Sequence, residues 1–165
     1  RAFGQLLFDR AVDDLDQRVY GQAIPLLAAY DAPRCLALLC DPTTDSRFRG
    51  ALYDVVTNDD TLLAELLKTP PDDRALIELA SRRADERLAA QLLARLDILT
   101  VQNPDGLYRA AERQRNPALT RALFARYATL PEPLKGHAAL LLEHTFNARI
   151  GNDVDAWTEW LAAHK

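Results

Sequence analysis

The chain has 165 residues, of which 48% are hydrophobic and 27% are charged, and its formal net charge is −4. This composition is too apolar for an intrinsically disordered protein, and a chain of this length buries a core without a metal ion or a disulfide. No run of 18 apolar residues occurs, which excludes a membrane span in this piece. The sequence lacks methionine and begins at Arg1, so we expect a piece of a longer protein.

Helical patterns begin at the N-terminus. Ala2–Phe8 resembles part of a helix. Pro25 lies inside an apolar stretch, so it either kinks one helix or starts a new one after Ile24. Asp31-Ala32-Pro33 indicates the start of a further helix that ends near Cys40.

Residues 46–57 form the next predicted helix, because apolar side chains recur on one side of it after a suitable N-cap, Asp45. Asn58-Asp59-Asp60 ends this helix and caps the next one, which carries the leucines of residues 62–67. Thr69-Pro70-Pro71 then ends that helix, because two prolines cannot continue the hydrogen-bond ladder.

The second half alternates in the same way between apolar stripes and breaks. Residues 98–101 are the only short run with a β-like composition, and they lack a partner strand. Asn103-Pro104-Asp105-Gly106 predicts a turn. Helices are predicted from Asp72 to about Ala80, over 84–97, over about 107–114, over 117–129, over 134–146, and after Gly151-Asn152-Asp153.

These patterns predict an all-α protein of about nine or ten helices with short polar turns. Short helices joined by short loops pack antiparallel to their neighbours. Many such pairs in series favour a solenoid over a four-helix bundle, which needs fewer and longer helices. We therefore expect one helical domain over residues 1–165.

Several segments resemble HEAT repeats. Residues 38–52 are similar to the pattern in which a first helix ends in Leu-Leu, an Asp-Pro turn follows and the second helix opens with Arg before Ala-Leu. Residues 87–93 and 116–123 are similar to the start of such a second helix. The leucines that anchor these segments are 40 and 31 residues apart, near the expected repeat length; they are Leu52, Leu92 and Leu123.

The C-terminal part carries the second point of likeness. Leu142–Phe146, followed by residues 151–161 with Trp157 and Trp160, resembles the closing unit of bacterial HEAT-repeat proteins, a group that includes HEAT-like proteins of the PBS-lyase type. The resemblance implies a right-handed α-α superhelix, a HEAT-like solenoid of short antiparallel helix pairs. It also implies a capping helix over 152–165, in which Trp157 closes the core. The resemblance covers residues 24–165, and we expect residues 1–23, which depart from it, to form an N-terminal helical cap.

Charge is unevenly distributed along the chain. Residues 1–73 hold 7 basic and 13 acidic side chains, whereas residues 74–126 hold 10 arginines and 6 acids. The arginines of the middle segment indicate either an anion-binding groove or a solvated face balanced by nearby acids, such as Glu78 with Arg82 and Glu112 with Arg115. The candidate interaction surface consists of Arg83, Arg87, Arg95, Arg121 and Trp160.

No residue pattern predicts catalysis, a cofactor or a metal ion. His137 and His144 are seven residues apart, about 10 Å along a helix, which is too far for one metal ion. Cys35 and Cys40 lie about 140° apart around a helix axis, so we expect two small buried hydrophobes rather than a disulfide. The compartment stays open, with the cytoplasm favoured over an oxidising one.

The sequence therefore predicts a non-catalytic scaffold that binds a protein partner on a curved helical surface. Two alternatives remain open: a nucleic-acid-binding or DNA-repair module that uses the arginine-rich middle, and a lyase-like enzyme on a similar scaffold. Duplex binding that falls steeply with salt would favour the nucleic-acid-binding module. A deep pocket with a buried carboxylate and an aromatic side chain would favour the enzyme.

Overall fold

The computed structural model describes residue 6 and residues 17–69, 71–130 and 132–164. Within these residues it is all-helical, with no strand, which confirms the predicted all-α class. The chain divides into two compact units, Arg1–Ala75 and Leu76–Lys165, and each is described by itself. Apart from Leu6, the predicted helix over Ala2–Phe8 lies outside the described residues, as does most of the predicted cap over 1–23.

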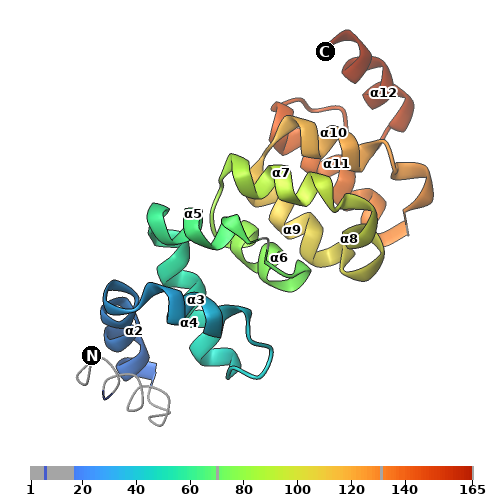
Figure 1. Ribbon diagram of the computed structural model, residues 1–165. Coiled ribbons are helices and arrows are strands. Elements are labelled where there is room, and N and C mark those ends of the chain that lie inside the picture. The colour runs from blue at the N-terminus through green and yellow to red at the C-terminus, as the bar shows by residue number, and fades with distance from the viewer. Residues whose placement is uncertain (1–5, 7–16, 70, 131, 165) are drawn as a thin grey trace. The chain divides into compact units, whose positions relative to one another are not determined.

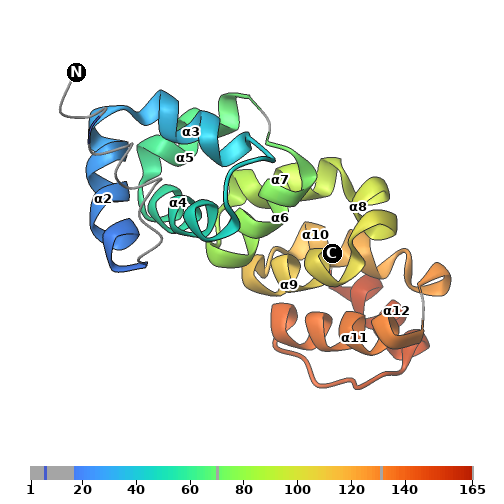
Figure 2. The same cartoon turned by 90° about the horizontal axis from the view of Figure 1, so that it is seen from below.

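The first unit consists of four helices joined by short turns. They are α2 (Gln17–Tyr30), α3 (Ala32–Cys40), α4 (Ser46–Asn58) and α5 (Asp60–Lys68). Consecutive helices contact each other, and α2 also contacts α4 while α3 contacts α5 (Figures 1 and 2). The unit is therefore two helix pairs whose corresponding members lie side by side.

Aspartate side chains start three of these helices. Asp31 accepts the Arg34 amide, Asp45 accepts the Arg47 and Phe48 amides, and Asp59 accepts the Thr61 and Leu62 amides; the N-caps are Asp31, Asp45 and Asp59. Each carboxylate satisfies amides that have no partner inside the first helical turn. Pro25 lies inside the single helix α2, so it does not start a new helix after Ile24.

Leucines fill the core of the first unit. The side chains that are almost fully removed from solvent come from all four helices: Ile24, Leu39, Leu52, Val56 and Leu63. Cys35 is buried, but Cys40, the last residue of α3, is exposed, so the expectation that both cysteines are buried is wrong for Cys40. Their angular separation on the helix explains the difference, because only one of the two can face the core.

The second unit holds seven α-helices and one short 3-10 helix among its described residues. These are α6 (Asp73–Arg82, which begins before Leu76), α7 (Glu86–Ala94), α8 (Leu96–Gln102), α9 (Pro104–Gln114), α10 (Pro117–Phe124), the 3-10 helix Tyr127–Thr129, α11 (Glu132–Phe146) and α12 (Val154–Ala163). Helix α9 contacts α7, α8 and α11, and α10 contacts α7 and α11 (Figure 1). Trp157 of α12 is fully buried against Phe124 and Leu142.

Two predicted elements of this unit differ in the structure. The helix predicted over 84–97 covers only Glu86–Ala94, and the β-like run 98–101 belongs to helix α8. Leu96 and Leu99 are buried three residues apart while Ile98 is exposed, so packing at helical spacing overrides the β-propensity of this run. The helix predicted to reach Thr129 ends at Phe124 and is followed by the 3-10 helix.

The predicted turn at Asn103–Gly106 is the first turn of helix α9. The Asn103 side chain accepts the Gly106 amide at 3.1 Å, and Pro104 occupies the start of the helix. A Cβ atom at Gly106 would lie only 2.7 Å from the Asn103 side chain, so the cap requires glycine there. The turn between α8 and α9 was predicted correctly, but the helix expected from about Leu107 already begins at Pro104.

No single helix among the described residues has the length and apolar character to cross a membrane. One bent pair, Gln22–Tyr30 with Ala32–Cys40, meets the criteria of length and composition when its two helices are taken together.

Candidate functional site

A groove of about 460 Å³ lies between α2 and α4 in the first unit. Helix α2 contributes Ile24, Pro25, Ala28 and Ala29 to it, and α4 contributes Ala51, Asp54, Val55 and Asn58, followed by Asp59 and Leu62; the lining is mainly apolar. The groove therefore lies between the first helices of two successive helix pairs, α2–α3 and α4–α5.

Small side chains create this groove. Ile24, Ala28 and Leu62 are buried beneath it, whereas Ala29 of α2 is exposed and Ala51 of α4 is half-buried. Alanine fills less of the space between two helices than leucine does, so a hollow remains where α2 faces α4. Leu26 and Tyr30 of the same helix are 55% and 68% exposed, but neither lines the groove, because both lie on another side of α2.

The charged side chains of the groove are acidic. Asp54 and Asp59 are both exposed, and no lysine or arginine occurs among the lining residues that the structure describes. Asp59 also caps helix α5 through the Thr61 and Leu62 amides, at 2.8 Å and 3.0 Å. An apolar hollow with two carboxylates at its edge complements a ligand that has an apolar anchor and positive charge beside it.

The arginines of the predicted interaction surface lie in the second unit, where several are engaged with groups of the same unit. Arg87 donates from Nε and Nη2 to the two carboxylate oxygens of Asp85, at 3.0 Å and 2.7 Å, and Arg83 Nη2 lies 3.9 Å from the same carboxylate. The hydrogen bond from Arg87 lowers the pKa of Asp85. Arg95 occupies the joint between α7 and α8, where its amide bonds Gln91 and Leu92 carbonyls.

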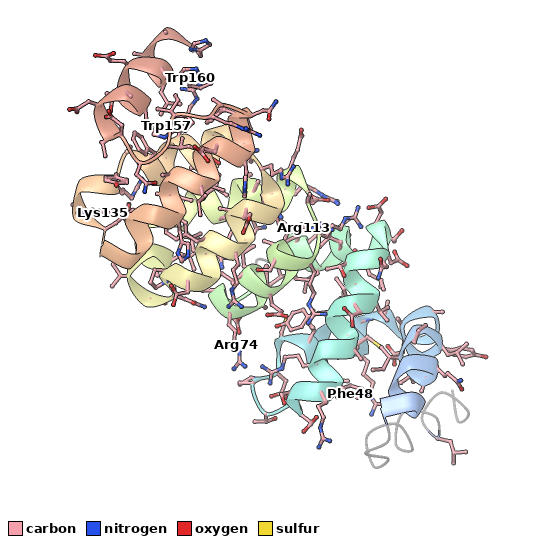
Figure 3. All side chains as sticks on the ribbon, turned by 180° about the vertical axis from the view of Figure 1, so that it is seen from behind. Phe48, Arg74, Arg113, Lys135, Trp157 and Trp160 are labelled. Carbon is pink, nitrogen blue, oxygen red and sulfur yellow. The ribbon has the colours of Figure 1, made fainter. Side chains whose placement is uncertain are left out.

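Arg121 and Trp160, the other two predicted surface residues, meet around Phe146. The Arg121 guanidinium lies 5.0 Å above the Phe146 ring and donates to the Leu161 and His164 carbonyls at the end of α12. The Trp160 ring lies 5.3 Å from Phe146 and stacks on His164 at 4.1 Å. Figure 3 shows both tryptophans on α12. Arg121 thus holds the C-terminal helix in place, as a cation does at a helix end.

Other arginines of this segment are also bound within the second unit. Arg82 bonds Glu78 at 2.7 Å, which confirms the predicted pair, and Arg126 pairs with Asp97. Arg113, labelled in Figure 3, donates to the Arg82 carbonyl at 3.2 Å. These contacts favour the balanced-face interpretation of the arginine-rich segment over a continuous anion-binding groove.

Glu112 does not have the partner that the sequence predicts. Its Oε1 lies 3.3 Å from His144 Nδ1, and no ion pair with Arg115 occurs in the described part of the chain. Helix α9 ends at Gln114, and Arg115 adopts a left-handed conformation with a φ of 47°. The helical spacing of the two residues is therefore broken at Arg115.

Comparison of the chain with protein-family models, with curated proteins and with solved structures finds no match. The HEAT-like resemblance consequently stays a prediction from the sequence motifs. The four arginines of the predicted surface lie in the arginine-rich segment, and no sequence pattern indicated the α2–α4 groove. The available signal was the small side chains of Ala28, Ala29 and Ala51 on the two helices.

Proposed function

We propose that this protein is a non-catalytic binding module, built on a HEAT-like solenoid of helix pairs, that holds an amphipathic helix of a protein partner in the α2–α4 groove. The partner helix carries a large apolar anchor with lysine or arginine on both sides of it. The observation that carries this proposal is the apolar hollow with Asp54 and Asp59 at its edge.

The packing of helix pairs supports the scaffold part of the proposal. In the first unit α2 contacts α4 and α3 contacts α5, so equivalent helices of successive pairs form two rows. Repeat proteins present one such row as a preformed binding face, and recognition comes from side chains on a rigid apolar stack. A preformed groove lowers the entropic cost of binding because its side chains are already ordered.

The composition of the groove supports a helical partner. Apolar faces of amphipathic helices bind hydrophobic grooves through anchors spaced three or four residues apart. The α2–α4 groove offers space above Ile24 and Ala28 for such an anchor. Asp54 and Asp59 then lie where cationic flanks of the partner would speed association and disfavour acidic helices.

Two designed helical peptides of equal length test this proposal. Both have the same apolar face of leucines; the polar face carries lysines in the Leu/Lys peptide and glutamates in the Leu/Glu peptide. We expect the Leu/Lys peptide to bind, measured by fluorescence anisotropy, and the Leu/Glu peptide to bind at least about tenfold more weakly. Ala29→Lys places a long cation at an exposed position of the groove, so it abolishes Leu/Lys binding without unfolding α2.

Removing the edge charges supplies the second test. The double variant Asp54→Asn with Asp59→Asn keeps a capping side chain on α5 and weakens both affinity and its salt dependence. Asp155→Asn, on the exposed face of α12, is the matched control and leaves binding unchanged. The proposal would be overturned if the Leu/Lys peptide bound the Ala29→Lys variant and the double variant with the same affinity as the wild type.

A further inference from the structure

A second hollow, of about 270 Å³, lies between α9 and α11 in the second unit. The two helices are in contact and lie side by side (Figure 2). Helix α9 contributes Asp105, Tyr108, Arg109 and Glu112, and α11 contributes His137, Leu140 and Leu141. Both sets follow the three- and four-residue spacing of one helix face, and the lining is mostly apolar. This volume is near the lower end for pockets that bind small molecules.

Tyr108 provides a buried polar group at this pocket. The residue is only 5% exposed, and its hydroxyl has no hydrogen-bond partner within the described part of the chain. Buried hydroxyls are normally hydrogen-bonded, so one without a partner beside a hollow indicates a place for a polar ligand atom. Burial raises the pKa of Tyr108 to about 12, which keeps the phenol protonated and able to donate.

The polar side of the pocket continues into a cationic surface hollow. Arg109 and Glu112 also line a neighbouring depression of about 570 Å³, together with Arg113 and Arg115. Glu112 is already engaged, because its Oε1 lies 3.3 Å from His144 Nδ1. Three guanidinium groups therefore border this end of α9, whereas Leu140 and Leu141 form the apolar side.

We propose that the α9–α11 pocket binds a small organic anion with an apolar body. The body lies on Leu140, Leu141 and the Tyr108 ring, while the carboxylate or phosphate faces Arg109 and accepts a hydrogen bond from the Tyr108 hydroxyl. Arginine suits this role because its planar guanidinium bonds both oxygens of such a group. This site is independent of the groove in the first unit.

Four probes separate the contributions of charge and apolar body: octanoate, octyl phosphate, octanamide and acetate. Each probe is titrated into the whole chain, and binding is measured by isothermal titration calorimetry. We expect octanoate or octyl phosphate to bind. Octanamide lacks the charge and acetate lacks the body, so each binds at least about tenfold more weakly. The stronger of the first two probes identifies the anion as carboxylate or phosphate. Equal binding of octanoate and octanamide would overturn the proposal.

Variants test whether the pocket residues are responsible. Arg109→Gln weakens octanoate binding by about tenfold, whereas Arg149→Gln, a control at another exposed arginine of the same unit, leaves it unchanged. Asp105→Asn removes a negative charge from the lining and therefore strengthens anion binding. Weaker binding in Asp105→Asn would contradict the assigned sign of the ligand.

Tyr108→Phe separates the role of the hydroxyl from that of the ring. The variant keeps the packing and removes a buried hydroxyl that has no partner, so the melting temperature is maintained or raised. Octanoate binding nevertheless weakens severalfold. Unchanged affinity in both Tyr108→Phe and Arg109→Gln would show that the probe binds elsewhere.

Discussion

The two units use polar side chains differently. In the first unit aspartates act locally: Asp31, Asp45 and Asp59 each accept amides two or three residues further along the chain. In the second unit polar side chains such as Asn103 and Asp153 also cap helices locally, but other polar side chains connect distant helices. Gln114 of α9 bonds the end of α6, 31 and 34 residues earlier, and Arg121 of α10 bonds the end of α12, 40 residues later.

This difference shows which polar contacts a sequence reveals. A cap depends on neighbours in the sequence, so an aspartate before an apolar stripe identifies it. A long-range hydrogen bond depends on how helices pack, and its residues look like ordinary surface polar residues. Gln114 is buried, yet nothing in residues 107–116 distinguishes it from an exposed glutamine.

The largest expected effect concerns Gln114. Its Nε2 donates to the Ala80 and Arg83 carbonyls at 2.7 Å and 2.6 Å, and its Oε1 accepts the Asp85 amide at 2.9 Å. Gln114→Ala leaves these backbone groups without their partner, so we expect a loss of about 3 kcal/mol in the free energy of unfolding. The measurement is urea denaturation followed by tryptophan fluorescence.

Tryptophan emission is a selective probe here, because both tryptophans of the chain, Trp157 and Trp160, belong to α12 of the second unit. Gln102→Ala is the matched control, since Gln102 is an exposed glutamine at the end of α8. An equal effect of the two substitutions would mean that Gln114 does not connect α9 to the end of α6.

A smaller effect is expected from the caps of the first unit. Asp45→Ala removes the acceptor of the Arg47 and Phe48 amides and lowers the free energy of unfolding by about 1 kcal/mol, measured by circular dichroism. Hydrogen exchange at these two amides becomes faster. Asp45→Asn retains a capping oxygen and changes stability by only a few tenths of a kcal/mol. Similar losses in the alanine and asparagine variants would exclude a capping role.

Much of the local structure could be predicted from the sequence. The helix expected over 46–57 is α4, its N-cap is Asp45, and Trp157 is buried as expected for a residue that closes the core. These features depend on local spacing and on the size of the indole. Helix α8 was missed because its residues favour strands when considered alone, and only the burial of Leu96 and Leu99 against neighbouring helices shows otherwise.

The candidate sites were harder to predict than the helices. The groove depends on Ala29 of α2 facing Ala51 of α4, two residues that no sequence motif connects. The α9–α11 pocket likewise is lined by both Tyr108 and Leu140. The sequence around each residue predicts only which side of its own helix is apolar. Sequence periodicity predicts which side of a helix is apolar, but the space left between two helices depends on their packing.

The smallest expected effect sharpens the comparison, because Asp85 of the second unit is both a local cap and an ion-pair partner. Its carboxylate accepts the Arg87 amide at 2.9 Å and the Arg87 guanidinium at 2.7 Å. The Arg87 hydrogen bond outweighs burial and lowers the pKa of Asp85. A carboxyl with a lowered folded-state pKa stabilises the protein above the unfolded-state pKa of about 3.9, and this contribution disappears as pH falls through the folded value.

Asp85→Asn keeps the cap but loses the charge, so we expect it to be less stable than the wild type by about 1 kcal/mol or less at pH 7. This difference stays constant down to about pH 5 and then shrinks as the wild-type carboxyl becomes protonated. Urea denaturation between pH 3 and pH 7 measures it. Asp153→Asn is the control for exchanging a carboxylate cap for an amide cap, because Asp153 caps α12 through the Ala156 amide at 3.0 Å. A difference at Asp85 that does not vary with pH would show that the cap alone stabilises the start of α7.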